Sequence, residues 1–262
     1  MTIKLKALAL AGTILAAPIF ANAAQAASII GLVDGKTIVI IDPATRKVTA
    51  EASVKGGPLL GFDVRPADGA LYGILADGSI VMVDPKTGQT TAKSKLSEPF
   101  KAGTDVTFDF NPAADRLRLM SSDGTSLRIN VDDGKVTVDG SHKFKDGDAN
   151  AGKTPKVVAG AYSNSLNPKP AATALYNIDA TTWTLVSQAP PNDGVLNTIG
   201  SLGITATAPV AFNIVASAGD KNDAWLATGG NLYSVDLKTG KAMLAGKLEG
   251  VTGKLTDIAW VD

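Results

Sequence analysis

The segment DGDANAG, which begins at Asp146, has oxygen-bearing side chains at every second position. In a calcium loop of the EF-hand type, ligands lie at positions 1, 3 and 5, with a glycine at position 6 and a bidentate glutamate at position 12. Asp146, Asp148 and Asn150 fit the first three positions, but positions 6 and 12 are Ala151 and Val157. The alternative is a turn in which these side chains accept hydrogen bonds from their own backbone. Calcium is therefore the only cofactor that the sequence suggests, and a plain turn stays open.

A second candidate site lies in the segment FDFNPAADRLRLMSSDGTSLRIN, which carries three arginines. Side chains alternate between the two faces of a strand, so two of these arginines share a face and the third, on the next strand, lies close to them. Converging guanidinium groups bind carboxylate or phosphate through paired hydrogen bonds. The alternative is an internal ion-pair network with nearby aspartates. The predicted binding set is Asp109, Asn111, Arg116, Arg118 and Arg128.

The segment PPNDGVLNTIG is a third candidate, because it joins a firm turn to the polar residues Asn197 and Thr198. Long polar loops on rigid scaffolds often bind ligands. A loop that only caps the fold is the alternative.

Covalent catalysis has little support in this chain. It has no cysteine, His142 is its single histidine, and no nucleophile-elbow sequence is present. A paired-carboxylate sugar hydrolase is disfavoured too, because aromatic residues make up only 5% of the chain. We therefore assign no catalytic residues, and the sequence favours a protein without enzymatic activity.

The first 26 residues have the three-part form of a secretory signal peptide. Two lysines precede an apolar run from Ala7 to Phe20, and small residues allow cleavage after Ala23 or Ala26. The run is shorter than the roughly 20 apolar residues that span a bilayer. We predict export to the periplasm or the medium, and one mature domain over 27–262.

The charge of the mature chain disfavours two classes of partner. Removing two lysines with the signal peptide leaves 23 basic against 25 acidic residues, a formal net charge of −2. Such a surface is a poor partner for nucleic acid or an anionic membrane. No later segment is apolar enough to span a bilayer, and without cysteine the fold depends on its core alone. We expect a monomer.

A strand–turn–strand motif repeats along the whole chain. Equivalent turn positions, 42 to 57 residues apart, are Asp42, Asp84, Asn130, Asp179 and Asp236. An upstream strand motif repeats as FDVRP, FDFNP, GAYSN, FNIVA and DIAWV. Four strands in about 40–50 residues is the size of a β-propeller blade.

The two ends of the chain complement each other. The mature chain begins with SIIGLVDG, which matches a second strand, and ends with LTDIAWVD, which matches first strands. Joined, they complete one blade and close the ring. We predict an all-β fold, a β-propeller of five four-stranded blades closed by the N- and C-terminal strands. Six blades and a β-sandwich are the alternatives, and the long segment 187–210 is either a loop or hides further strands.

Four motifs carry a family resemblance: FDFNPAADRLRLMSSDGTSLRIN, DGDANAG, LYNID and PPNDGVLNTIGSLG, in this order. Together they resemble the bacterial secreted family known as domain of unknown function 4394. The resemblance implies a propeller-like fold and export, and it implies no activity.

The sequence as a whole favours an exported, non-catalytic binding or scaffold protein of the cell envelope, with a small molecule or an envelope protein as its partner. The alternative is a calcium-dependent hydrolase or lactonase that uses the DGDANAG loop. A convergent cluster of four or more oxygens in a pocket would distinguish the second from the first.

Overall fold

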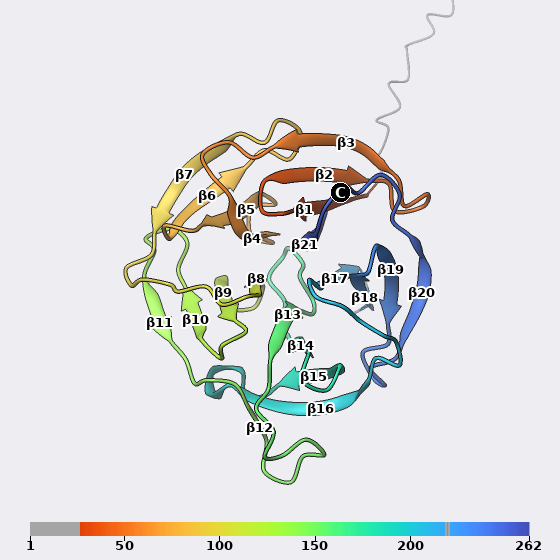
Figure 1. The fold of residues 1–262 in the computed structure, drawn as a ribbon. Helices are drawn as coiled ribbons and strands as arrows, with labels where there is room; N and C mark the ends of the chain where they lie inside the picture. Colours follow the sequence, from red (N-terminus) through yellow and green to blue (C-terminus); the bar gives the residue numbers. More distant parts are fainter. Residues whose placement is uncertain (1–26, 218, 220, 262) are drawn as a thin grey trace, which may run out of the picture.

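Five β-sheets surround a central axis like the blades of a fan (Figure 1). The structure is a computed structural model that describes residues 27–217, 219 and 221–261. The predicted signal peptide lies outside the described residues. The predicted five-bladed propeller is confirmed.

The blades follow one another along the chain, and the strands of each blade run from an inner strand at the axis to an outer strand at the rim. Blade 1 contains β21 (Leu255–Val261), β1 (Ser28–Val33), β2 (Thr37–Ile41) and β3 (Val48–Ser53). Blade 2 contains β4 (Leu59–Val64), β5 (Leu71–Leu75), β6 (Ser79–Val83) and β7 (Thr90–Lys95). Blade 3 contains β8 (Val106–Asn111), β9 (Arg116–Ser121), β10 (Ser126–Ile129) and β11 (Val136–Val138).

Blade 4 contains β13 (Val157–Tyr162), β14 (Leu175–Asp179), β15 (Thr184–Gln188) and β16 (Val195–Ser201). A short fifth strand, β12 (Lys143–Phe144), pairs in parallel with the outer edge of β16. Blade 5 contains β17 (Ala211–Ser217), β18 (Lys221–Thr228), β19 (Asn231–Val235) and β20 (Ala242–Lys247). The uncertain segment 187–210 thus supplies the outer strand of blade 4, a short 3-10 turn at Pro191–Asp193, and a loop.

Blade 1 is built from both ends of the described chain, as the sequence predicts. β1 pairs antiparallel with β21, from Ser28 opposite Val261 to Val33 opposite Leu255. This pairing satisfies the edge of each strand and closes the ring without a disulfide.

The repeated turns use the aspartates that the sequence singles out. The side chain of Asp42 accepts the N–H of Thr45 at 2.6 Å, and that of Asp84 accepts the N–H of Lys86 at 2.8 Å. The second turn ends at Gly88 with φ of 70°. A β-carbon there would lie 2.1 Å from the carbonyl oxygen of Ser53 in the neighbouring blade, so the turn requires glycine.

The core lies between the blades. Inner strands are covered on both faces, which explains why all six residues of β13 are buried. Between blades 2 and 3, the rings of Tyr72 and Phe108 contact Phe110 edge-to-face, with centroids 5.6 and 5.9 Å apart.

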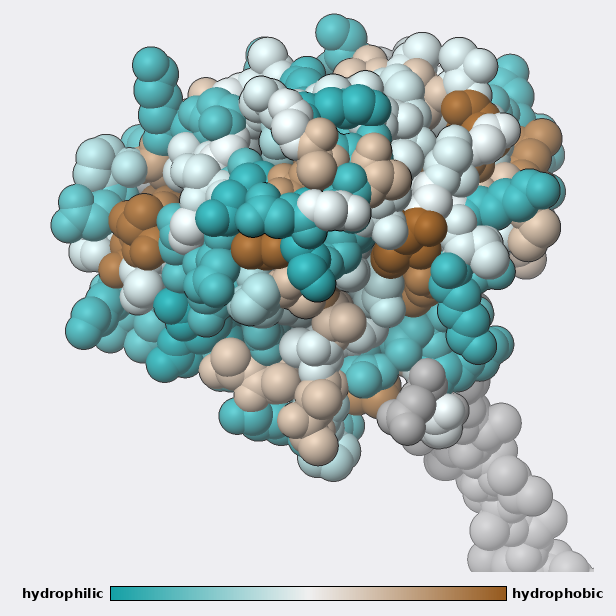
Figure 2. Space-filling view, turned by 90° about the horizontal axis from the view of Figure 1, so that it is seen from below, coloured by the Kyte–Doolittle hydropathy of each residue, from teal (hydrophilic) through white to brown (hydrophobic). Residues whose placement is uncertain are grey.

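The outer surface of the ring is mainly hydrophilic. On the rim that carries β12 and β16, hydrophobic residues appear as separated spots among hydrophilic ones (Figure 2). Within the described part of the chain, no helix has the length and apolar character needed to cross a bilayer.

The ring closure can be tested with two leucines. Leu32 in β1 is fully buried, whereas Leu244 in the outer strand β20 is 63% exposed. We expect Leu32→Ala to lower the free energy of unfolding by about 2–5 kcal/mol, because it leaves a cavity at the closing blade. Leu244→Ala should change it by about 0.5 kcal/mol or less. Urea unfolding followed by circular dichroism measures both, and equal effects would contradict the role of blade 1.

Candidate ligand-binding site

Three aspartates connect neighbouring inner strands near the axis of the ring. Each carboxylate accepts a backbone N–H group of the next blade at 2.8–2.9 Å. Asp257 in β21 accepts the N–H of Phe62 in β4, Asp63 in β4 accepts that of Phe110 in β8, and Asp109 in β8 accepts that of Tyr162 in β13. We call these three contacts the aspartate bridges. They tie four inner strands together where no ladder hydrogen bonds join one blade to the next.

The remaining inner strand, β17, carries Asn213 at the corresponding place, and β13 carries Ala161. The side-chain amide of Asn213 hydrogen-bonds to Asp63. The methyl group of Ala161 offers no acceptor, so no bridge runs from β13 to β17. The set of bridges is therefore broken on one side of the ring.

Burial changes the acidity of the bridging carboxyl groups. It raises the pKa of Asp63 to about 7, against the opposing effect of the N–H groups that it accepts. Burial also raises the pKa of Asp109 and of Asp257 well above the usual range, and the charge of Asp63 adds to the rise in both. These groups therefore hold protons at pH values where ordinary aspartates have lost them.

A cavity of about 420 Å³ opens at the end of the ring where the inner strands end. We call it the axial cavity. Its walls come from β4, β17, β21 and the loop after β13, and its lining residues are Asp63, Val64, Pro66, Gly69, Ser165, Leu166, Asn167, Asn213, Ile214, Val215, Ala216, Trp260 and Val261. Its size is typical of small-molecule sites, and its lining combines polar and apolar surface.

A second cavity, of about 280 Å³, lies where the inner strands begin. Residues at or next to the start of all five inner strands contribute to it, among them Leu59, Val106, Val158, Val210 and Thr256. The aspartate bridges, in the middle of the inner strands, lie between the two cavities.

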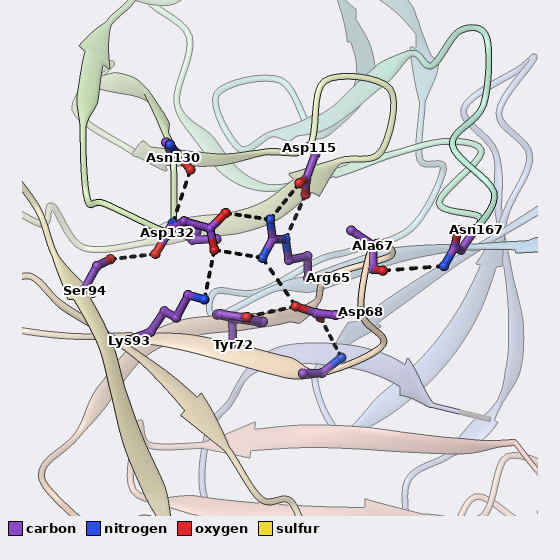
Figure 3. A network of polar contacts seen from close by, with 12 residues as sticks. Arg65, Ala67, Asp68, Tyr72, Lys93, Ser94, Asp115, Asn130, Asp132 and Asn167 are labelled. Atoms are coloured by element: carbon purple, nitrogen blue, oxygen red, sulfur yellow. Dashed lines mark hydrogen bonds and ion pairs between the residues drawn. The ribbon is translucent and has the colours of Figure 1, made fainter.

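An ion-pair network supports the rim of the axial cavity (Figure 3). The guanidinium of Arg65 lies 2.6 Å from Asp115 and 3.2 Å from Asp132, both in blade 3, and 3.3 Å from Asp68 in its own blade. It also lies over the ring of Tyr72, 5.8 Å from the ring centre. Arg65 thereby joins blades 2 and 3 beside the residues that line the cavity.

The same network reaches the loop after β13. The side-chain amide of Asn167 donates to the carbonyl of Ala67 at 3.5 Å (Figure 3). Because Asn167 and Pro66 both line the cavity, this contact holds two parts of its rim together.

The predicted arginine set is only partly brought together. Arg118, 1% exposed, and Arg128 both form ion pairs with Asp139 in blade 3. Arg118 also donates to the hydroxyl of Tyr162 at 3.2 Å, which places it in an internal network. Arg116 is exposed and shares a shallow groove of about 220 Å³ with Arg128.

Asp109 and Asn111 have other partners. Asp109 forms one of the aspartate bridges, and Asn111 accepts the N–H of Ala114 at 2.8 Å in the turn that follows β8. The five predicted residues therefore serve three separate places, and anion binding by the arginines stays a prediction.

The DGDANAG segment forms a hydrogen-bonded loop on β16. Asp148 accepts the backbone N–H of Thr198 at 2.7 Å and its hydroxyl at 2.6 Å. The side-chain oxygen of Asn150 accepts the ammonium of Lys153 at 2.9 Å, and Asp146 is exposed. In the described part of the chain, no group of three or more His, Cys, Asp or Glu side chains is arranged to hold a metal ion. Calcium binding stays a prediction.

His142 is buried away from the axial cavity. Its Nε2 lies 3.3 Å from the sulfur of Met120. Burial lowers its pKa to about 4, so the ring is neutral at physiological pH.

The sequence reasoning missed three residues of this site: Asn213, Asp257 and Trp260. A signal was present for the first, because FNIVA places Asn213 where FDFNP has Asp109. The motif DIAWV also contains Asp257, which has the same role as Asp63 in FDVRP: each carboxylate accepts an N–H group of the next inner strand.

The fold and the axial cavity define a five-bladed β-propeller with a small-molecule-sized pocket at one end of its axis. The chain belongs to the family described as a domain of unknown function (DUF4394), whose sequence profile matches residues 37–259. A comparison with proteins of curated function found no match.

Two solved structures of proteins of unknown function are similar to this chain. A protein from Bacteroides thetaiotaomicron VPI-5482 is 14% identical, with 88% of this chain and 63% of that chain covered and a TM-score of 0.55. A protein from Bacteroides caccae is also 14% identical, with 86% of this chain and 73% of that chain covered and a TM-score of 0.45. The first supports the fold alone, and this chain spans less than two thirds of it.

The raised pKa of Asp63 makes stability depend on pH. Between pH 3.8 and about 7 the folded protein holds a proton that the unfolded chain has lost, so the free energy of unfolding falls as the pH rises through this window. We expect Asp63→Asn to weaken this fall, because an amide does not ionise. Urea unfolding at intervals from pH 4 to 8 measures it.

Asp236→Asn is the matched control. A backbone hydrogen bond from Lys238 lowers the pKa of Asp236, so its contribution is lost only as the pH falls below about 4. In Asp236→Asn, the slope of the free energy of unfolding against pH between pH 5 and 8 should equal that of the wild type. An unchanged slope in Asp63→Asn would show that Asp63 is ionised across this range.

The DGDANAG loop can be tested by removing its two carboxylates one at a time. Asp148→Ala should lower the free energy of unfolding by about 1–3 kcal/mol, because the N–H and hydroxyl of Thr198 lose their acceptor. Asp146→Ala should have little effect. Thermal unfolding with EDTA and with millimolar calcium tests the metal site: a calcium-dependent rise in midpoint that Asp148→Ala abolishes would establish it, and equal midpoints would leave the loop a hydrogen-bonded turn.

Proposed function

We propose that the protein is an exported, non-catalytic binding protein of the cell envelope that holds a small molecule in the axial cavity. One observation carries the proposal: Asp63, which is only 7% exposed, and Asn213 present polar groups to a solvent-open cavity whose walls combine polar and apolar surface. Buried polar groups that line a pocket give orientation and specificity to a ligand.

The way the cavity is built supports a preformed site. Its walls include β4 and β21, which the bridge from Asp257 to Phe62 connects, and Arg65 joins blades 2 and 3 beside the lining residues. A rigid site loses little conformational entropy when a ligand binds.

The chemistry of the lining favours binding over covalent catalysis. Ser165 supplies the only hydroxyl side chain among the described lining residues, and it donates to the carbonyl of Tyr162 at 3.3 Å. A nucleophilic serine needs an adjacent base. The described lining residues include no histidine or lysine that could serve as one.

A fragment screen with a blocking variant tests this function. A set of small amines, alcohols and carboxylic acids is screened by ligand-observed NMR. Ala216 lines the cavity, so Ala216→Phe should fill part of it and weaken fragment binding about tenfold or more. Ala92→Phe, on the exposed outer strand β7, is the matched control and should bind like the wild type.

Both variants must keep the wild-type circular dichroism spectrum for the comparison to count. Binding that Ala216→Phe leaves unchanged, or a screen in which no fragment binds the wild type, would refute a ligand site in the axial cavity.

A further inference from the structure

The described lining of the axial cavity can carry a negative charge but no positive one. Among the described residues that line it, Asp63 is the only one with an ionisable side chain. The other polar groups, on Ser165, Asn167 and Asn213, are neutral. A bound ligand therefore meets one charged group of known sign.

The carboxylate of Asp63 has no cation beside it among the described residues. Its partners are the N–H groups of Phe110 and Val64 and the amide of Asn213. The titratable groups that face it from neighbouring inner strands are Asp109 on β8 and Asp257 on β21, whose raised pKa values favour the neutral, protonated form.

No basic side chain of the described residues pairs with the carboxyl groups near the axis. Across residues 27–217, 219 and 221–261, no ion pair involves any of the three bridging aspartates. Arg65, two residues from Asp63, pairs with Asp68, Asp115 and Asp132 instead. A negative charge on Asp63 is therefore not balanced by an ion pair within this part of the protein.

An aromatic wall completes the cavity. Trp260 lines it and stacks on Trp225, with ring centres 5.7 Å apart, so its position is fixed. Indole rings attract cations as well as apolar groups. An anionic ligand, by contrast, would meet the acidic centre of the ring without a compensating charge.

We propose that the ligand of the axial cavity is a small organic cation with a protonated nitrogen, which pairs with the carboxylate of Asp63 while its apolar part contacts Trp260. This inference rests on the proposed binding function and names the ligand class for that site. The ammonium group supplies the positive partner that Asp63 lacks among the described residues. Ser165 and Asn167 accept its remaining hydrogen bonds or those of neighbouring polar groups.

Binding of such a ligand requires Asp63 to be ionised. Below the pKa of Asp63, about 7, the ligand displaces a proton, which passes to the solvent. Affinity should then rise about tenfold for each pH unit up to that pKa and level off above it. A neutral ligand would show no such dependence.

Two probes of matched shape, benzylamine and benzyl alcohol, test the inference. On the wild-type protein at pH 8, we expect benzylamine to bind about tenfold more tightly or better, and to weaken about tenfold for each unit below pH 7. Asp63→Asn should remove the preference for the amine, and Asp236→Asn, at a distant turn, should keep it. Calorimetry measures the affinities.

A second measurement does not depend on the folding of a variant. Calorimetric titration of the wild type with benzylamine at pH 6, in buffers of different ionisation enthalpy, counts the protons released. Close to one proton for each ligand supports the inference, and none overturns it.

The outcomes separate this inference from the function on which it rests. If neutral fragments occupy the cavity and amines show neither preference nor pH dependence, the cation inference is wrong and the binding function stands. If no fragment of any charge binds in a manner sensitive to Ala216→Phe, both are wrong.

Discussion

The hydrogen bond from an inner-strand N–H to a carboxylate of the preceding blade is the interaction on which this ring depends. The inner strands of neighbouring blades belong to different sheets, so no ladder hydrogen bonds join them. The N–H groups of Phe62, Phe110 and Tyr162 would be buried without an acceptor. A short acidic side chain satisfies each of them and fixes the spacing of two blades. The cost is the burial of three carboxyl groups near the axis, whose raised pKa values favour the neutral form.

The aspartate bridges do not continue from β13 to β17, and there the ring departs from five-fold symmetry. β13 carries Ala161 and β17 carries Asn213, so the side of the ring around β17 has fewer charged bridges. The axial cavity is bounded by β17, by its neighbour β21, and by the loop after β13. Structural support and the lining of the cavity thus share a residue. Asp63 both spaces blades 2 and 3 and faces the cavity, so a change at this position affects the stability of the ring and the charge of the cavity together.

The sequence is sufficient for the fold because each blade repeats local information. The aspartate or asparagine at the start of each turn and the matching halves at the two ends predict five blades, their order and their closure. Partners of long charged side chains are harder to predict. Arg118 pairs with Asp139 of its own blade rather than Asp109 or Asp63, and Arg65 pairs with Asp115 in the next blade. These contacts depend on how far a long side chain reaches along a blade interface, and strand periodicity does not contain that information. The same limit hid Asp257, whose role shows only when β21 is placed beside β4.

The closure of blade 1 also sets the order in which the blades can be completed during folding. Blades 2 to 5 consist of neighbouring hairpins, which form through local contacts, whereas β1 pairs with a strand from the other end of the chain. Leu32 and Thr256, which meet across this pairing, are 224 residues apart. During synthesis on a ribosome, β1 is made long before β21. Until β21 and blade 5 follow, one edge of β1 and the face that packs against blade 5 stay uncovered, and such surfaces promote aggregation. The oldest strand of the ring is therefore the last to be completed.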